Sequence, residues 1–271
     1  MQGVSRASLA SAEERLEALL GAPGVDRVAV ADALFAVTGL LDGNVSLRRA
    51  LTDPSQQGDA KAGLSTRLLA GKVPDGVVDL VAGLARSRWS RARDLADALE
   101  ELAVISLVAS AEAEGRLDRV EDELFRFRRM VAGDDELGNA LSDRAATSER
   151  KVRLVEQLLA EKVAPETLRL VRQAVQAPRG LNLDTALAGY GQVAARRREQ
   201  LVAHVVAALP LDEAQRGRLE EALRRAYGKA VHLNVDVDPD VLGGIRVEIG
   251  DEVLDGTVVR RLDDARRRLA G

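Results

Sequence analysis

The sequence predicts a mostly α-helical protein with a small α/β domain at its C-terminal end. Apolar residues recur at helical spacing through residues 1–200, and this helical region contains an internal duplication. Beyond residue 201 the apolar residues alternate as in strands. Aromatic residues are few (three Phe, two Tyr and one Trp), so the cores must be built from Leu, Val and Ala, which suits helical bundles.

The duplication relates two helical segments of the chain. A gapless alignment of the sequence with itself at a shift of 90 residues matches 18 of the 52 positions from Val30 to Val81. Some matched pairs are not the Ala and Leu that fill any helix, namely Gly43 with Gly133, Phe35 with Phe125 and Asp53 with Asp143. A period of this length is too long for a solenoid and indicates a duplicated domain. We expect two tandem bundles, residues 1–102 and 103–200.

One long helix is expected to join the two bundles. Helical spacing continues without a break between Arg91 and Glu114 through Leu95, Leu99, Leu102, Ile105 and Val108. This shared helix would close the first bundle and open the second.

Two helix starts are predicted from capping-box spacings. Ser11 is followed by Glu14, and Asp118 is followed by Glu121. In such a box each side chain bonds the other residue's backbone N–H, so we expect helices to begin at Ser11 and at Asp118.

The C-terminal segment, residues 201–271, predicts a strand–helix–strand–strand–helix unit. Strands are expected over 201–208, 231–237 and 245–249, where apolar residues alternate or run together. The first helix should begin at Asp212, because Gln215 completes a capping box. Gly243 and Gly244 are expected to form the turn before the last strand, at least one of them with positive φ. The final helix carries Val258, Leu262, Ala265 and Leu269 on one face.

Composition excludes several classes of function. The 39 basic and 43 acidic residues give a net charge of −4, which lacks the basic excess of nucleic-acid-binding proteins. Without cysteine there are no thiol or thiolate sites, and two histidines are too few for an obvious zinc site. No apolar run is long enough for a membrane-spanning segment.

No motif in the chain predicts a catalytic, cofactor or metal site. There is no phosphate-binding loop, and the Gly243–Gly250 glycines lie between two strands instead of a strand and a helix. The arginine runs 196–198 and 266–268 have acidic neighbours and suit a solvated or protein-facing helix surface. We therefore expect no catalytic residue, no cofactor and no metal.

The segment from Val241 to Thr257, with Leu262 after it, resembles the C-terminal signature of the delta subunit of bacterial F-type ATP synthases. The family includes the mitochondrial oligomycin-sensitivity-conferring protein. Three upstream motifs stand where the family has them, namely Gly115-Arg116-Leu117, Leu141-Ser142-Asp143 with Lys151, and Pro178-Arg179-Gly180. The resemblance covers about Ala103 to Gly271. Residues 1–102 are similar to the extension of actinobacterial forms, which may be fused to other stalk parts. Without a membrane helix in the chain, we do not expect the fused form.

The resemblance implies a non-catalytic stator subunit on the cytoplasmic face of the bacterial plasma membrane, one copy per complex. It would tie the alpha/beta head to the b-type subunits of the peripheral stalk. In the family an alpha-subunit helix binds between the first and fifth helices of the bundle, which map to Val104–Glu114 and Glu166–Gln176. The residues implied there are Ala103, Leu107, Ala111, Leu170 and Ala174. Those implied on the b-subunit side are Leu242, Gly243, Gly244, Ile245 and Leu262, with the Leu242–Gly256 hairpin and the last helix as contacts.

Two other classes of function remain open from the residues alone. A helical-bundle adaptor for nucleic acid or signalling partners is the first, and binding that weakens steeply with salt would favour it. An enzyme is the second, and any turnover by the isolated chain would favour it.

The two copies differ in charge. Glu121, Arg126, Arg128 and Arg129 are matched by Ala31, Ala36, Thr38 and Gly39 in the first copy. That copy has therefore become buried against a neighbour or lost a partner. We expect the first bundle to extend the stalk side and to contact a b-type subunit.

Overall fold

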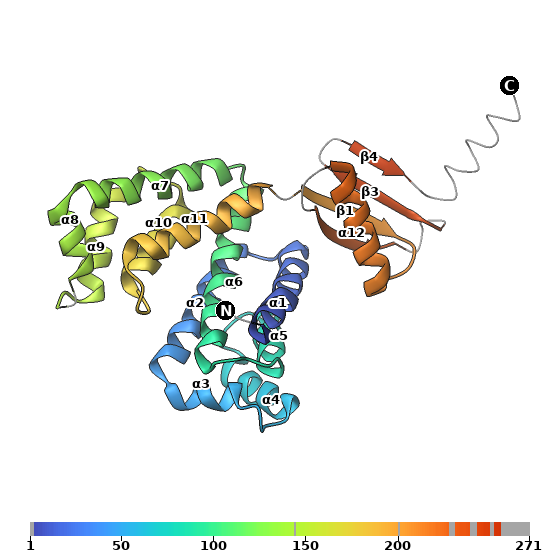
Figure 1. Ribbon diagram of the computed structural model, residues 1–271, viewed down its shortest axis with the longest axis horizontal. Coiled ribbons are helices and arrows are strands. Elements are labelled where there is room, and N and C mark those ends of the chain that lie inside the picture. Colours follow the sequence, from blue (N-terminus) through green and yellow to red (C-terminus); the bar gives the residue numbers. More distant parts are fainter. Residues whose placement is uncertain are drawn as a thin grey trace, which may run out of the picture. The chain divides into compact units, whose positions relative to one another are not determined.

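The computed structural model describes residues 3–143, 145–199, 201–227, 231–238, 243–249 and 252–255. The chain divides into two compact units, residues 1–197 (the helical unit) and residues 198–271 (the C-terminal unit). Figure 1 shows helices throughout the first unit and a small sheet with one helix in the second. The predicted fold class, mostly helical with a small α/β region, is confirmed.

The helices of the helical unit repeat along the chain. The first set comprises α1 (Val4–Gly21), α2 (Arg27–Gly43), α3 (Val45–Thr52), α4 (Gly58–Leu69) and α5 (Asp75–Arg86). After α6 (Ala92–Ala113) come α7 (Leu117–Gly133), α8 (Asp135–Ser142), α9 (Ser148–Leu159), α10 (Pro165–Gln176) and α11 (Leu183–Glu199). Both bounds of α7, α8, α9 and α10 lie 90 residues after those of α2, α3, α4 and α5. The duplication read from the sequence therefore extends to the limits of each helix.

Helix α6 belongs to two cores, as its unbroken apolar spacing predicts. Its N-terminal half, including Leu95, Leu99 and Leu102, packs with α1–α5 in the first core. Its C-terminal half, including Leu107 and Val108, packs with α7–α11 in the second core. A single rigid helix thus carries the apolar faces of both bundles (Figure 1).

Both predicted capping boxes of the helical unit are wrong. Ser11 lies in the middle of α1, which begins at Val4. Helix α7 begins at Leu117, one residue before Asp118, and no side chain caps it. In both places the apolar stripe extends past the polar pair, so burial outweighs local capping.

Several helix starts that the structure does cap use a single acceptor side chain. Asp26 accepts hydrogen bonds from the N–H groups of Val28 and Ala29 at the start of α2. Asn44 caps α3, and Asp134, its counterpart in the second copy, caps α8. The duplicated short helices therefore keep their caps although the capping residue differs.

The C-terminal unit holds a four-stranded sheet in the order β2-β1-β3-β4. The strands are β1 (Leu201–Ala207), β2 (Val231–Val237), β3 (Ile245–Ile249) and β4 (Glu252–Asp255), and α12 (Glu213–Tyr227) connects β1 with β2. Strand β1 pairs parallel with β2 and antiparallel with β3. Leu223 of α12 packs on the inward residues of the sheet. The predicted box at the start of α12 forms, since Asp212 and Gln215 exchange hydrogen bonds of 2.9 and 2.7 Å.

Two parts of the C-terminal prediction change. Strands β2 and β3 lie on opposite sides of β1, so they are not the two arms of a paired hairpin. The paired hairpin is β3–β4, and β4 was not predicted because its four residues are too short for alternation to show. The predicted final helix lies outside the described residues.

Gly243 and Gly244 both have positive φ, 69° and 87°, as expected for at least one of them. Val at either position would be held in a conformation that β-branched residues avoid. We expect Gly243→Val or Gly244→Val to lower the free energy of unfolding of the C-terminal unit by about 1–3 kcal/mol. Thermal melts followed by a probe in each unit would measure this, with the helical unit unchanged.

Gly217 in α12 provides the matched control for this turn. A Cβ atom at Gly217 would contact nothing within 4 Å, and its backbone is helical. Gly217→Ala should therefore leave the unit as stable as the parent or more so. If the two valine variants melt like the parent, the strain assigned to the turn is wrong.

No single helix in the described ranges is long and apolar enough to cross a membrane. The pair α2 and α3 passes that test of length and composition only together, with a bend of 105° between them.

Candidate partner-binding surfaces

The five residues implied at the alpha-subunit site lie on two helices that contact each other. Ala103, Leu107 and Ala111 belong to α6, and Leu170 and Ala174 belong to α10. All five are buried, each at most 1% exposed. The structure thus brings them together, as packing residues within the chain.

Helix α2 of the first bundle packs against α6 beside these residues. Ala31 is fully buried and belongs to the second core, although it comes from the first copy. Val28 and Phe35 of α2 pack against the same core. The small side chain of Ala31, where the second copy has Glu121, lets the two helices approach closely. Of the four positions where the second copy is charged, Ala31 and Thr38 are buried within the chain, whereas Ala36 and Gly39 stay exposed.

An open groove of about 570 Å³ runs between α2 and α10. Its α2 wall contains Asp32, Phe35, Ala36 and Gly39, and its α10 wall contains Pro165, Leu168, Arg169, Arg172, Gln173 and Gln176. An ion pair of 3.6 Å between Arg169 and Asp32 crosses it. The groove offers an apolar strip with charged edges, the chemistry that receives an amphipathic helix.

Arg179 ties the two bundles together. It comes from the Pro178-Arg179-Gly180 motif between α10 and α11, and its side chain is only 5% exposed. The guanidinium binds Asp42 of α2 and both Asp97 and Glu100 of α6, the last two at 2.8 and 2.5 Å. Arg93 of α6 in turn donates to the Arg179 carbonyl. One loop of the second bundle is thereby fixed to two helices of the first.

Arg197 makes a second link at the end of α11. Its guanidinium binds Glu17 of α1 and Glu112 of α6, with closest distances of 2.5 and 2.6 Å. Tyr190 of α11 also donates a hydrogen bond of 2.8 Å to Glu100. The sequence predicted that Arg197 lies on either a solvated or a protein-facing helix surface, and in the structure it faces protein.

Arg116, from the Gly115-Arg116-Leu117 motif, stabilises the second bundle internally. Arg116 donates to the buried Glu166 of α10 at 2.7 Å, and Ser110 of α6 bonds the same carboxylate. Burial opposes the charge of Glu166, but the hydrogen bonds from Arg116 prevail and lower its pKa. The motif therefore fixes the turn between α6 and α7 onto α10.

Glu13 of α1 lies near the second link, and its surroundings disfavour the charged form of its carboxyl group. Burial, with the nearby carboxylates of Glu101 and Glu17, raises its pKa to about 7 although Arg196 opposes this. A raised acid pKa means that stability is fully present below the unfolded pKa of 4.5 and is lost as the pH rises through 7. We expect Glu13→Gln to stabilise the helical unit at about pH 8 by roughly 1 kcal/mol, discounted for partial exposure, and to have no effect near about pH 4.

Urea unfolding of both proteins across that pH range would measure the difference. A gain that is the same at both pH values would contradict the role of the Glu13 charge.

The residues implied on the b-subunit side are only partly described. Ile245 begins β3, and Gly243 and Gly244 precede it at the surface. Leu242 and Leu262 lie outside the described residues. Exposed apolar side chains of this unit include Leu209, Val237, Val253 and Leu254. The unit therefore presents apolar surface, part of it (Val253 and Leu254) within the signature segment.

The described residues contain no group of three or more His, Asp or Glu side chains placed to hold a metal ion. The charged clusters that do form are the arginine links, which pair opposite charges between helices. Sequence reasoning missed both links, because only the fold shows which carboxylates face Arg179 and Arg197.

Comparisons with known proteins agree on one family. The family model described as ATP synthase delta (OSCP) subunit matches residues 103–269. "ATP synthase subunit delta" of Kineococcus radiotolerans is 51% identical over 99% of this chain and 98% of its own. The proteins of that name from Streptomyces coelicolor and Beutenbergia cavernae are 53% and 52% identical over the whole chain, and cover 98% and 100% of theirs. Residues 1–102, outside the family model, are thus shared by these relatives.

Proposed function

The chain belongs to the ATP synthase delta (OSCP) subunit family, and we propose that it is the stator that links the alpha/beta head to the b-type subunits of the peripheral stalk. It acts without catalysis, as a peripheral subunit on the cytoplasmic face of the bacterial plasma membrane, one copy per complex. The observation that carries the proposal is the full-length similarity to delta subunits, first bundle included.

The helical unit has the mechanical properties that a stator needs. A stator resists the torque of rotary catalysis, so its parts must not slide past each other. Helix α6 is common to both bundle cores, and Arg179 and Arg197 bind helices of the first bundle from the second. These links oppose relative motion of the two bundles at two separate places.

The groove between α2 and α10 is proposed as the site of the alpha-subunit helix. The resemblance implied a groove between α6 and α10, but the residues named there are buried and α2 packs beside them. The exposed part of α10 borders α2 instead. The apolar stripe of such a helix would contact Phe35 and Leu168, and its charged flank would contact Arg172.

A bulky side chain at Gly39 should block this groove without disturbing the fold. Gly39 is exposed, lines the groove, and has nothing within 4 Å of the position of a Cβ atom. We expect Gly39→Phe to weaken binding of a peptide from the alpha N-terminus by at least about tenfold, which corresponds to roughly 1.4 kcal/mol. Calorimetric titration of the peptide into the intact chain would measure it.

Gly43→Phe is the matched control, since Gly43 ends the same helix, is equally open and lies outside the groove lining. Its affinity should equal that of the parent. Equal binding by Gly39→Phe would place the alpha-subunit helix elsewhere. Removal of residues 1–101 is a poorer test, because the cut falls inside α6 and exposes its apolar faces.

The C-terminal unit and the first bundle are proposed to face the b-type subunits. Val253 and Leu254, which are exposed and lie within the signature segment, offer apolar contact area on the C-terminal unit. The whole function can be tested with bacterial membranes from which the chain has been removed. Adding the chain back should restore ATP-driven proton pumping. ATP hydrolysis by the head released from these membranes should not require the chain. Pumping that is equally strong without the chain would contradict the proposal.

A further inference from the structure

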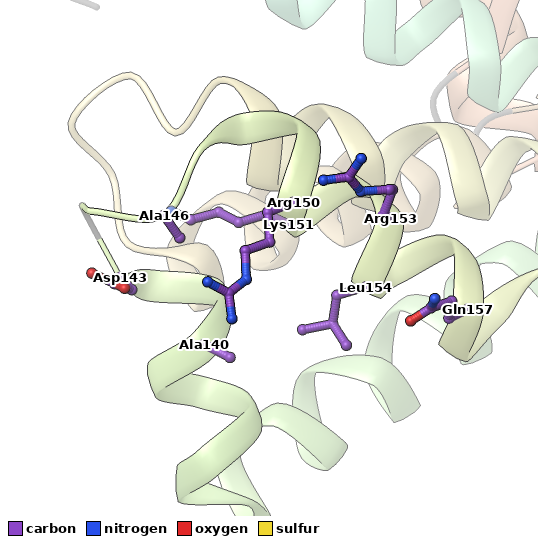
Figure 2. A pocket seen from close by; sticks show the side chains of 8 residues that line it. All are labelled: Ala140, Asp143, Ala146, Arg150, Lys151, Arg153, Leu154 and Gln157. Atoms are coloured by element: carbon purple, nitrogen blue, oxygen red, sulfur yellow. The ribbon is translucent and has the colours of Figure 1, made fainter.

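A pocket of about 330 Å³ lies between α8 and α9, away from the α2–α10 groove. Arg150, Lys151 and Arg153 of α9 line it together with Asp143, and Leu154, Ala140, Ala146 and Gln157 complete the wall. Figure 2 shows the guanidinium of Arg150 directed toward Ala140, across the opening between the two helices. The volume falls at the lower end of the range for small-molecule sites.

Arg150, Lys151 and Arg153 supply the positive charge of the pocket. Within the described part of the chain, none of their side chains makes a hydrogen bond or an ion pair, although Arg153 is close enough to Glu149 to help lower its pKa after the hydrogen bonds at that helix end. Lys151 is the most unusual, because it is only 8% exposed. Its aliphatic stem is packed, while its ammonium still reaches solvent at the pocket. Asp143 is engaged by the N–H of Ala145 at 2.8 Å.

The first copy supplies an internal comparison. At a shift of 90 residues, Lys61 corresponds to Lys151 and donates to the carbonyl of Ser87 at 3.4 Å. Arg150 and Arg153 correspond to Ala60 and Gly63. The first copy therefore satisfies its buried lysine internally and lacks the two arginines. The second copy has gained two cations around a lysine that is left open.

We propose that this pocket binds a small molecule that carries a phosphate group. Three cations and one carboxylate leave a net charge of +2 at the site, which complements the charge of about −1.5 to −2 on a phosphate monoester. Arginine offers a planar fork and lysine a compact charge, and both bind phosphate oxygens. Leu154, Ala140 and Ala146 would face the organic part of the ligand.

Titration of inorganic phosphate into the intact, ¹⁵N-labelled chain at low salt tests the site. We expect saturable shifts confined to amides of α8 and α9, and at least a tenfold weaker affinity in the double variant Arg150→Ala with Arg153→Gly. These are the residues of the first copy, and both arginines are exposed, so the variant should fold as the parent does.

Two further measurements make the assignment decisive. Lys61→Met should bind phosphate like the parent, while Lys151→Met should not bind it, with circular dichroism as the check that each variant folds. The absence of saturable shifts, unchanged affinity in the double arginine variant, or equally strong binding of citrate would each overturn the proposal of a phosphate site.

Discussion

Leu107→Ala is expected to lower the free energy of unfolding of the helical unit by about 2–5 kcal/mol. Leu107 is fully buried on α6 and packs in the second core, so truncation leaves a cavity between helices. The resemblance alone implied that this side chain contacts an alpha-subunit helix, in which case its removal would weaken binding and leave stability unchanged. Urea unfolding of the two proteins distinguishes a packing residue from a contact residue.

Leu40→Ala on the neighbouring helix α2 is the control for this change. Leu40 is 45% exposed, so the same truncation should change the stability by no more than about 0.5 kcal/mol. A loss of stability in Leu107→Ala no larger than that would show that α6 is not packed as the structure has it.

Arg179→Met is expected to lower the stability of the helical unit by about 2–4 kcal/mol. Removing one partner of a buried ion pair costs about 3–5 kcal/mol, and the figure is reduced here because Asp42 and Asp97 remain partly exposed. The change removes the cation that Asp42, Asp97 and Glu100 share, although Asp42 keeps Arg48 at 3.5 Å and Asp97 keeps Arg93 at 3.6 Å. The links between the loop after α10 and helices α2 and α6 are lost together.

Hydrogen exchange would show where this loss falls. Amides of α2 and α11 should lose protection in Arg179→Met, because the bundles separate more readily there. Arg196→Met is the control, since Arg196 is exposed and, among the described residues, its ion pair is with Glu101 at 2.9 Å. Such a pair contributes less than about 1 kcal/mol. Equal stability of the two variants would contradict the role of Arg179 as a link between the bundles.

The 90-residue repeat and the spacing of apolar residues were sufficient to predict most of the fold. The repeated Gly43 and Gly133 end α2 and α7, and the apolar spacing from Leu95 to Val108 gave α6 as one helix. These features depend on neighbours along the chain. Strand β4 and the pairing of β3 with β1 depend on contacts across the sheet, and the alternation within β3 carries no information about them.

The surfaces for partners were harder to predict, for a physical reason. Ala31 and Thr38, uncharged in the first copy, indicated a face buried against a neighbour or one that had lost its partner. The structure shows that Ala31 packs in the same core as residues of α6 of the same chain. An internal contact and an external one bury the same residue types, so small apolar side chains such as Ala103 and Ala111 do not distinguish them.

In the function that we propose, one copy of this chain holds the head and the b-type stalk at the same time. Native mass spectrometry of the alpha/beta head mixed with the soluble part of the b-type subunits, with and without the chain, tests this most directly. We predict that a particle with the head, the b-type subunits and one copy of the chain forms only when the chain is added. A head–stalk particle of the same abundance without the chain, or a chain that binds neither component, would contradict the account.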